Sequence, residues 1–185
     1  QNGTGKLASA DGFFTNAAVK ILMPEEAKKV ESTLRNIGLG SLVDKAVLSM
    51  NRAAEDAAKS ATPIFVEAIK AMTISDALGI LKGGDYAATN YFKDKTTVYL
   101  ANAFRPVIEK ALTKVNATKY WNDVFTAYNK FAAKPVNTDL VTYVTEKSLI
   151  GIFYEVGQEE LKIRKDPAAR VTDLLKKVFG SNTQQ

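Results

Sequence analysis

The residues of this chain that are best suited to chemistry follow a Gly-Gly pair. Residues 81–104 read LKGGDYAATNYFKDKTTVYLANAF, and two helical patterns meet at the pair. Backbone amides at the start of a helix attract anions, so with Asp85, Thr89 and Tyr91 they could line a small polar site. The same stretch also fits an ordinary joint, in which a left-handed Gly83 closes one helix and Asp85 caps the next. No Gly-Lys-Ser/Thr follows and no strand precedes, which excludes a phosphate-binding P-loop.

A second polar pattern lies in LSMNRAAE, residues 48–55. Arg52 and Glu55 are three residues apart, so they can pair on one helix face. This pair is either an ordinary surface pair or part of a partly buried cluster that reaches another helix. Glu55 could also form a carboxylate pair with Asp76 or Asp85, as in enzymes that hydrolyse sugars. The sequence gives no sign that these carboxylates face one another.

Composition excludes several kinds of chemistry. The chain has 185 residues, without cysteine or histidine. Disulfides, thiolate nucleophiles, Ser-His triads and zinc held by nitrogen or sulfur are therefore excluded. We predict neither a metal site nor a cofactor. The net charge of +5 is spread over basic residues interspersed with acidic ones, a pattern typical of a solvated surface.

The apolar residues that must position these side chains recur with helical spacing, and Pro and Gly separate the runs. We predict an all-α fold, a single compact multi-helix bundle of about eight helices preceded by an extended N-terminal arm. Phe13, Phe14, Ile21 and Leu22 should anchor this arm. The expected helices span residues 24–37, 41–59, 63–72, 73–82, 85–115 (with a break before Thr96 and a tilt near Arg105), 117–134, 140–165 and 167–180.

The core and the domain limits follow from the same pattern. Residues 1–12 should form a flexible segment, residues 13–180 a single helical domain, and residues 181–185 a tail. Apolar side chains expected in the core include Leu42, Ile69, Tyr120, Trp121, Phe125, Tyr128 and Phe131. Asp139 lies in a good position to cap the helix that starts at Leu140, and Thr73 or Ser75 can cap the helix that contains Asp76. Gly151 and Gly157 should mark close contact with another backbone.

Five segments together resemble the bacterial family called domain of unknown function 4197. They read DGFFTNAAVKILMPE, LSMNRAAE, PIFVEAIKAMTISDALGIL, KGGDYAATNYF and IRKDPAARVTDLLKKVFG, and they span residues 11–180. The resemblance implies an all-helical protein of Gram-negative bacteria, usually made with an export signal and often a lipoprotein. It implies a location in the periplasm or anchored to the cell envelope, with a lipid anchor upstream of this sequence. It implies no established activity.

Three functions compete on this evidence. The first is a non-enzymatic envelope protein that binds an unknown protein or a small apolar ligand between its helices. The second is a hydrolase that uses the carboxylates named above. The third is a basic surface for anionic lipid or nucleic acid, formed by Lys162, Arg164, Lys165, Arg170, Lys176 and Lys177, although nearby acidic residues dilute it and we expect no nucleic acid partner.

The oligomeric state stays open. A binding site or buried polar cluster would draw on ten candidate residues: Asn51, Arg52, Glu55, Asp76, Asp85, Thr89, Tyr91, Arg105, Glu159 and Arg164.

Overall fold

The computed structural model describes residues 2–130, 133–135, 139–166 and 168, and in these residues all regular structure is helical. The predicted all-α bundle of about eight helices is confirmed. The elements are α1 (Asn2–Leu7), the 3-10 turn η1 (Glu25–Ala27), α2 (Lys28–Asn36), α3 (Gly40–Ala58), α4 (Ala61–Lys70), α5 (Ile74–Lys82), α6 (Ala87–Lys114), α7 (Ala117–Asn129) and α8 (Leu140–Lys165).

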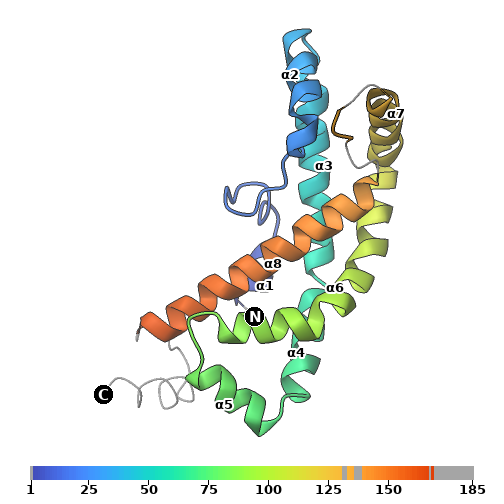
Figure 1. Ribbon diagram of the computed structural model, residues 1–185. Coiled ribbons are helices and arrows are strands. Elements are labelled where there is room, and N and C mark those ends of the chain that lie inside the picture. The colour runs from blue at the N-terminus through green and yellow to red at the C-terminus, as the bar shows by residue number, and fades with distance from the viewer. Residues whose placement is uncertain (1, 131–132, 136–138, 167, 169–185) are drawn as a thin grey trace.

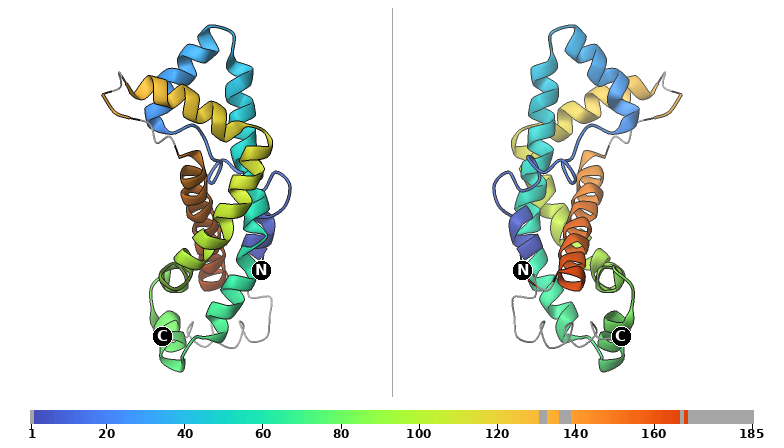
Figure 2. Two further views of the ribbon diagram at one scale, coloured as in Figure 1. Left: turned by 90° about the vertical axis from the view of Figure 1, so that its right-hand side faces the viewer. Right: turned by 90° about the vertical axis from the view of Figure 1, so that its left-hand side faces the viewer.

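Three long helices form the centre of the bundle. Helix α6 packs against both α8 and α3, and the short α1 lies beside α8 (Figure 1). Helices α4 and α5 form one end of the molecule, while α2 and α7 form the other (Figure 2). The chain is therefore an elongated bundle whose two ends differ in the helices that build them.

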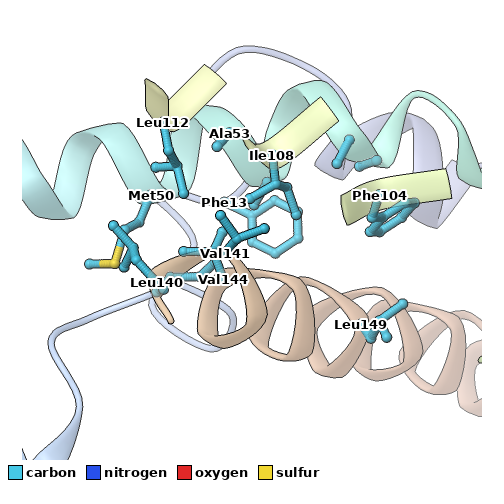
Figure 3. Close-up of a cluster of buried hydrophobic side chains, with 14 of the residues drawn as sticks. Phe13, Met50, Ala53, Phe104, Ile108, Leu112, Leu140, Val141, Val144 and Leu149 are labelled. Carbon is cyan, nitrogen blue, oxygen red and sulfur yellow. The ribbon is translucent and has the colours of Figure 1, made fainter. Parts of the chain in front are cut away.

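The core lies where α3, α6 and α8 meet. Figure 3 shows Met50 of α3, Ile108 of α6 and Val144 of α8 directed into the same space, and Phe13 of the arm enters between them. Gly151 makes room for that ring, because a Cβ built there would lie 2.6 Å from the Phe13 Cε1 atom. The predicted backbone contact at Gly151 is therefore wrong, because the close neighbour is an aromatic side chain of the arm.

The N-terminal arm is held more firmly than the sequence suggested. We expected a flexible segment at residues 1–12, yet the chain forms helix α1 there, and Leu7 is fully buried. Phe13 and Ile21 anchor the arm as predicted, whereas Leu22 is exposed. The arm continues without regular structure to Pro24, where η1 begins.

The predicted break before Thr96 is wrong, because α6 is continuous. The hydroxyl of Thr96 donates to the carbonyl of Phe92 at 2.6 Å, so this residue satisfies its side chain within the helix. Pro106 lies inside α6 and cannot donate to the preceding turn. Figure 1 shows that α6 changes direction along its length, as a helix with an internal proline is expected to do.

Several apolar residues expected in the core are instead exposed: Leu42, Ile69 and Tyr120. Trp121 and Phe125 of α7 are buried as expected, and Tyr128 packs against the core edge. Phe131, the expected helix at 167–180 and the tail at 181–185 lie outside the described residues, apart from Ala168.

Candidate functional site

The candidate residues of α3 hold the N-terminal arm. The Glu55 Oε1 atom accepts hydrogen bonds from the backbone amides of Phe13 and Phe14, both at 3.2 Å. Arg52 donates to Glu55 Oε2 and to Asp11 Oδ1, each at 2.7 Å. We call Asp11, Arg52 and Glu55 the arm cluster. Glu55 accepts from the amides of the arm and from Arg52, and Asp11 accepts from Arg52. The pair therefore belongs to a partly buried cluster, but this cluster reaches the N-terminal arm rather than another helix.

Asn51 adds a second attachment of the arm, one helical turn earlier. Its side chain accepts from the amide of Ile21 at 2.9 Å and donates to the carbonyl of Ile21 at 2.8 Å. A further bond runs to the carbonyl of Val47 at 2.7 Å. A fully buried amide bonded in this way replaces the strand partner that an extended segment would otherwise need.

The amides at the start of α6 are not free. Glu160 of α8 accepts from the backbone amides of Ala88 and Thr89 at 2.9 and 2.8 Å, and from the Thr89 hydroxyl at 2.8 Å. The anion at this helix N-terminus is therefore supplied by the chain itself. The predicted role of Asp85 as a cap is wrong, because Tyr86 occupies the N-cap position of α6. The predicted left-handed conformation of Gly83 is also wrong, because its backbone is extended.

Arg164 links the same carboxylate to helix α5. Its guanidinium donates to Glu160 Oε1 at 2.7 Å and to the carbonyls of Ile80 and Gly83 at 2.7 and 3.4 Å. Beside it, Lys165 pairs with Asp85 at 2.7 Å. We call Glu160, Arg164 and Thr89 the joint cluster, because they join the end of α5, the start of α6 and the end of α8.

Burial would raise the pKa of Glu160. The hydrogen bonds from Ala88, Thr89 and Arg164 outweigh that effect and leave the pKa below its usual value. Glu160 is therefore a structural anion rather than a proton donor at neutral pH.

Other candidate residues serve as helix caps or exposed pairs. Asp139 accepts from the amide of Thr142 at 3.0 Å and thereby caps α8 as predicted. Arg105 of α6 reaches both residues, at 2.7 Å to the Thr142 hydroxyl and 3.2 Å to Asp139. Glu159 pairs with Lys162 at 3.2 Å.

Two buried carboxylates were missed by the sequence reasoning, Glu155 and Glu160. Glu155 accepts from the Asn16 side chain at 2.8 Å and lies 3.6 Å from Lys6 Nζ. Both acids continue the buried stripe of α8, three and eight residues after Ile152. Acidic residues in phase with an apolar helical stripe are the signal that could have found them.

The carboxylates proposed for hydrolysis are engaged in three different places. Glu55 lies in the arm cluster, Asp76 caps α5, and Asp85 pairs with Lys165 on the approach to α6. No hydrogen bond joins any two of them in the described part of the chain. The geometry gives this alternative no support.

A pocket of about 640 Å³ opens between α4, α5 and α6. It brings together two of the candidate residues, Asp76 and Tyr91. The Tyr91 ring is fixed by an edge contact with Phe92 at 5.6 Å between centroids, and Phe92 contacts Phe65 of α4 in the same way. We call this pocket the α4–α6 pocket. Its lining residues are Pro63, Ile64, Glu67, Ala68, Ala71, Thr73, Asp76, Tyr91, Lys95, Thr96 and Tyr99.

Few charges face the α4–α6 pocket. Glu67 lines the pocket and forms an ion pair at 2.8 Å with Lys70, which does not line it. Asp76 forms a capping box with Thr73, and the hydroxyl and amide of Thr73, followed by the charge of Lys95, keep its pKa below the usual value. The Lys95 Nζ atom lies 5.8 Å from the centre of the Tyr91 ring, within cation–π range.

Large apolar side chains stand exposed on the three helices that form the α4–α6 pocket. Ile74 and Leu78 of α5 are 83% and 48% exposed, and Tyr99 of α6 is 67% exposed. Ile69 of α4 joins this set. Exposed apolar groups gathered around a pocket are typical of an interaction site.

A second pocket, of about 520 Å³, lies between the arm and α8. The arm backbone forms much of its wall, and the Tyr143 hydroxyl donates to the carbonyl of Leu22 there at 2.8 Å. Burial, and then the charges of Glu26 and Glu25, raise the pKa of Tyr143 to about 12. Two exposed apolar side chains, Leu22 and Ile150, also line this pocket, but charged groups of Lys20, Glu25, Glu26, Glu146 and Lys147 line it as well.

No group of three or more Asp or Glu side chains in the described residues is placed to hold a metal ion. Within the same residues, none of the helices combines the length and hydropathy needed to cross a membrane. Fold and site thus define a small helical protein with an apolar pocket and internally satisfied polar clusters. A family model described as protein of unknown function (DUF4197) matches residues 1–180, so the chain belongs to the DUF4197 family. Neither a curated protein nor a solved structure matches the chain.

Proposed function

We propose that this protein is a non-enzymatic binding module that takes the apolar part of a ligand into the α4–α6 pocket. The observation that carries the proposal is the pocket itself, which is open, lined largely by apolar groups and bordered by the exposed Tyr99 ring. Its volume of about 640 Å³ falls in the range of small-molecule sites in proteins.

The charges of the pocket favour an uncharged ligand. Two carboxylates, of Glu67 and Asp76, and one ammonium group, of Lys95, line it. Asp76 is already satisfied by Thr73, and no cluster of basic groups lines the pocket to receive an anion. An apolar molecule would cover the Ile64 side chain and the exposed Tyr99 ring of the lining without leaving a charge unpaired.

The joint cluster supports this function from outside the pocket. Arg164 and Glu160 fix the end of α5 against the start of α6, and these two helices form two of the pocket walls. The candidate polar residues would then act by holding the walls in place rather than by contacting the ligand.

From the family resemblance we extend the proposal to location. The protein would work in the periplasm or anchored to the cell envelope, where apolar molecules must be carried through water. Fractionation of cells that express the full-length gene tests this, and recovery of the protein in the cytoplasmic fraction would reject it.

Binding of the uncharged dye Nile red tests the pocket. Ala68→Trp places an indole among the lining residues and should weaken dye binding by about tenfold or more, a loss of roughly 1.4 kcal/mol. Ala77→Trp is the matched control, because Ala77 is exposed on α5 and does not line the pocket. Circular dichroism checks that both variants fold. Equal dye affinity in the two variants would refute the proposal.

A further inference from the structure

We propose that the N-terminal arm presents an open strand edge in the pocket between the arm and α8, and that an extended peptide of another protein, with basic side chains, docks on this edge. The surface shares no lining residue with the α4–α6 pocket. Three features support the docking: the backbone of the arm, the apolar side chains beside it and the carboxylates around it.

Residues 19–24 of the arm have the geometry of a strand. Burial alternates along them, because Val19, Ile21 and Met23 are buried while the residues between them are more exposed. The amide and the carbonyl of Ile21 both bond to the Asn51 side chain, at 2.9 and 2.8 Å, as a strand residue bonds to its neighbour in a sheet. One edge of this strand is therefore occupied by α3.

The opposite edge faces the pocket. Backbone groups of successive strand residues point to opposite edges, so those of Lys20 and Leu22 lie on the side away from Asn51. From that side, Tyr143 of α8 donates to the Leu22 carbonyl at 2.8 Å. Among the described residues, the Leu22 amide has no acceptor and the Lys20 carbonyl has no donor. An unpaired edge of this kind is a template for a further extended chain.

Apolar side chains stand beside this edge. Leu22 of the arm and Ile150 of α8 line the pocket and are 57% and 61% exposed. Side chains of a docked peptide would cover both, and the removal of apolar surface from water favours binding by about 25 cal/mol per Å². The edge thus offers hydrogen bonds and its neighbours offer apolar contact, the combination used when a peptide adds a strand to a domain.

The carboxylates around the edge favour a basic peptide. Glu26 and Glu146 line the pocket, and neither forms an ion pair with a described residue. The two lysines of the lining, Lys20 and Lys147, each lie within cation–π range of an aromatic ring instead. Lysine or arginine side chains of a peptide would pair with the two carboxylates, and salt should weaken that attraction.

Heteronuclear NMR of the full chain tests the docking on the unmodified protein. The probe is the end-blocked pentapeptide Lys-Val-Lys-Val-Lys, which extends over about 17 Å, the length of residues 20–24. Its titration should move the Leu22 amide proton downfield, as expected for a new hydrogen bond. The control peptide Glu-Val-Glu-Val-Glu should bind at least about tenfold more weakly. No shift of Leu22 at about 1 mM basic peptide, or equal affinity for the two peptides, would refute the docking.

Matched variants separate the backbone edge from the charges. Leu22→Pro removes the amide and should weaken binding of the basic peptide about fivefold relative to Leu22→Ala, which loses the side chain but keeps the amide. Glu26→Gln with Glu146→Gln should weaken binding about fivefold at low salt. Asp94→Asn with Glu109→Gln, an equal charge change at exposed sites outside the pocket, should leave it unchanged. Circular dichroism checks that all variants fold, and equal affinities within either matched pair would refute the proposal.

Discussion

Replacing Glu160 by Gln should destabilise the protein more than any other single amide-for-carboxylate change on α8. In the native structure, each oxygen of this side chain accepts from at least two donors, among them the amides of Ala88 and Thr89 and the guanidinium of Arg164. A Gln side chain keeps one oxygen and directs its NH₂ group at the donors of the other. At least two buried donors then lose their acceptor.

The size of the effect follows from those donors. Each buried donor left unpaired costs about 1–3 kcal/mol, so with two such donors Glu160→Gln should lower the free energy of unfolding by about 2–6 kcal/mol. Glu159→Gln is the control, because Glu159 makes only an exposed pair with Lys162 and should cost less than about 1 kcal/mol. Urea unfolding followed by circular dichroism at pH 7 measures both, and an unchanged slope against urea would show that only stability has changed.

The difference between wild type and Glu160→Gln should also depend on pH. Because the folded-state pKa of Glu160 lies below its usual value of 4.5, its stabilising effect is present above that pH and is lost as the pH falls through the folded-state pKa. The two unfolding free energies should therefore converge in acid. A Glu160→Gln variant within about 0.5 kcal/mol of wild type at pH 7, or one no less stable than Glu159→Gln, would refute the role given to this carboxylate.

Two further predictions concern the arm. Gly151→Ala should lower the free energy of unfolding in urea by about 1–3 kcal/mol, because its Cβ would lie 2.6 Å from the Phe13 ring. Gly79→Ala is the control: nothing lies within 4 Å of the new Cβ, so it should stabilise α5 by up to about 1 kcal/mol. Equal effects of the two substitutions would contradict the packing of Phe13 on Gly151. In an absorbance titration of the seven tyrosines, one phenol should ionise near its pKa of about 12, and Tyr143→Phe should remove that step. Since the folded-state pKa is the raised one, stability should fall as the pH rises above 10. Ionisation of all seven tyrosines near pH 10 would contradict the partly buried position of Tyr143.

Local signals in the sequence predicted the helices whose ends are local. Helix α8 spans Leu140–Lys165 as expected, because Asp139 caps it within one turn. Likewise Thr73 and Asp76 form a capping box at the start of α5. Both contacts join residues three apart, and such spacing can be read directly from a sequence.

The predictions that failed depended on distant residues. The start of α6 is capped by Glu160, more than 70 residues later, so nothing near Asp85 could indicate that it is not the cap. Gly83 was expected in a left-handed turn, but its lack of a side chain serves packing, since a Cβ there would lie 2.6 Å from the Ala87 Cβ atom. The α4–α6 pocket was not foreseen in position, because its walls come from three helices and periodicity does not give their relative placement.

The buried acids suggest how this fold divides structure from function. Glu55 and Glu160 each accept backbone amides from a segment that has no helical partner for them, and Glu155 holds the arm through Asn16. A carboxylate whose lone pairs are filled by donors, and whose pKa is lowered as at Glu160, is a poor proton acceptor for a substrate at neutral pH. Changes at these acids should therefore alter pocket binding only indirectly, through stability and through the placement of the helices that they join. Changes at the pocket wall, such as Ala68→Trp, should alter binding while the fold persists, and this contrast separates a binding module from an enzyme built on its carboxylates.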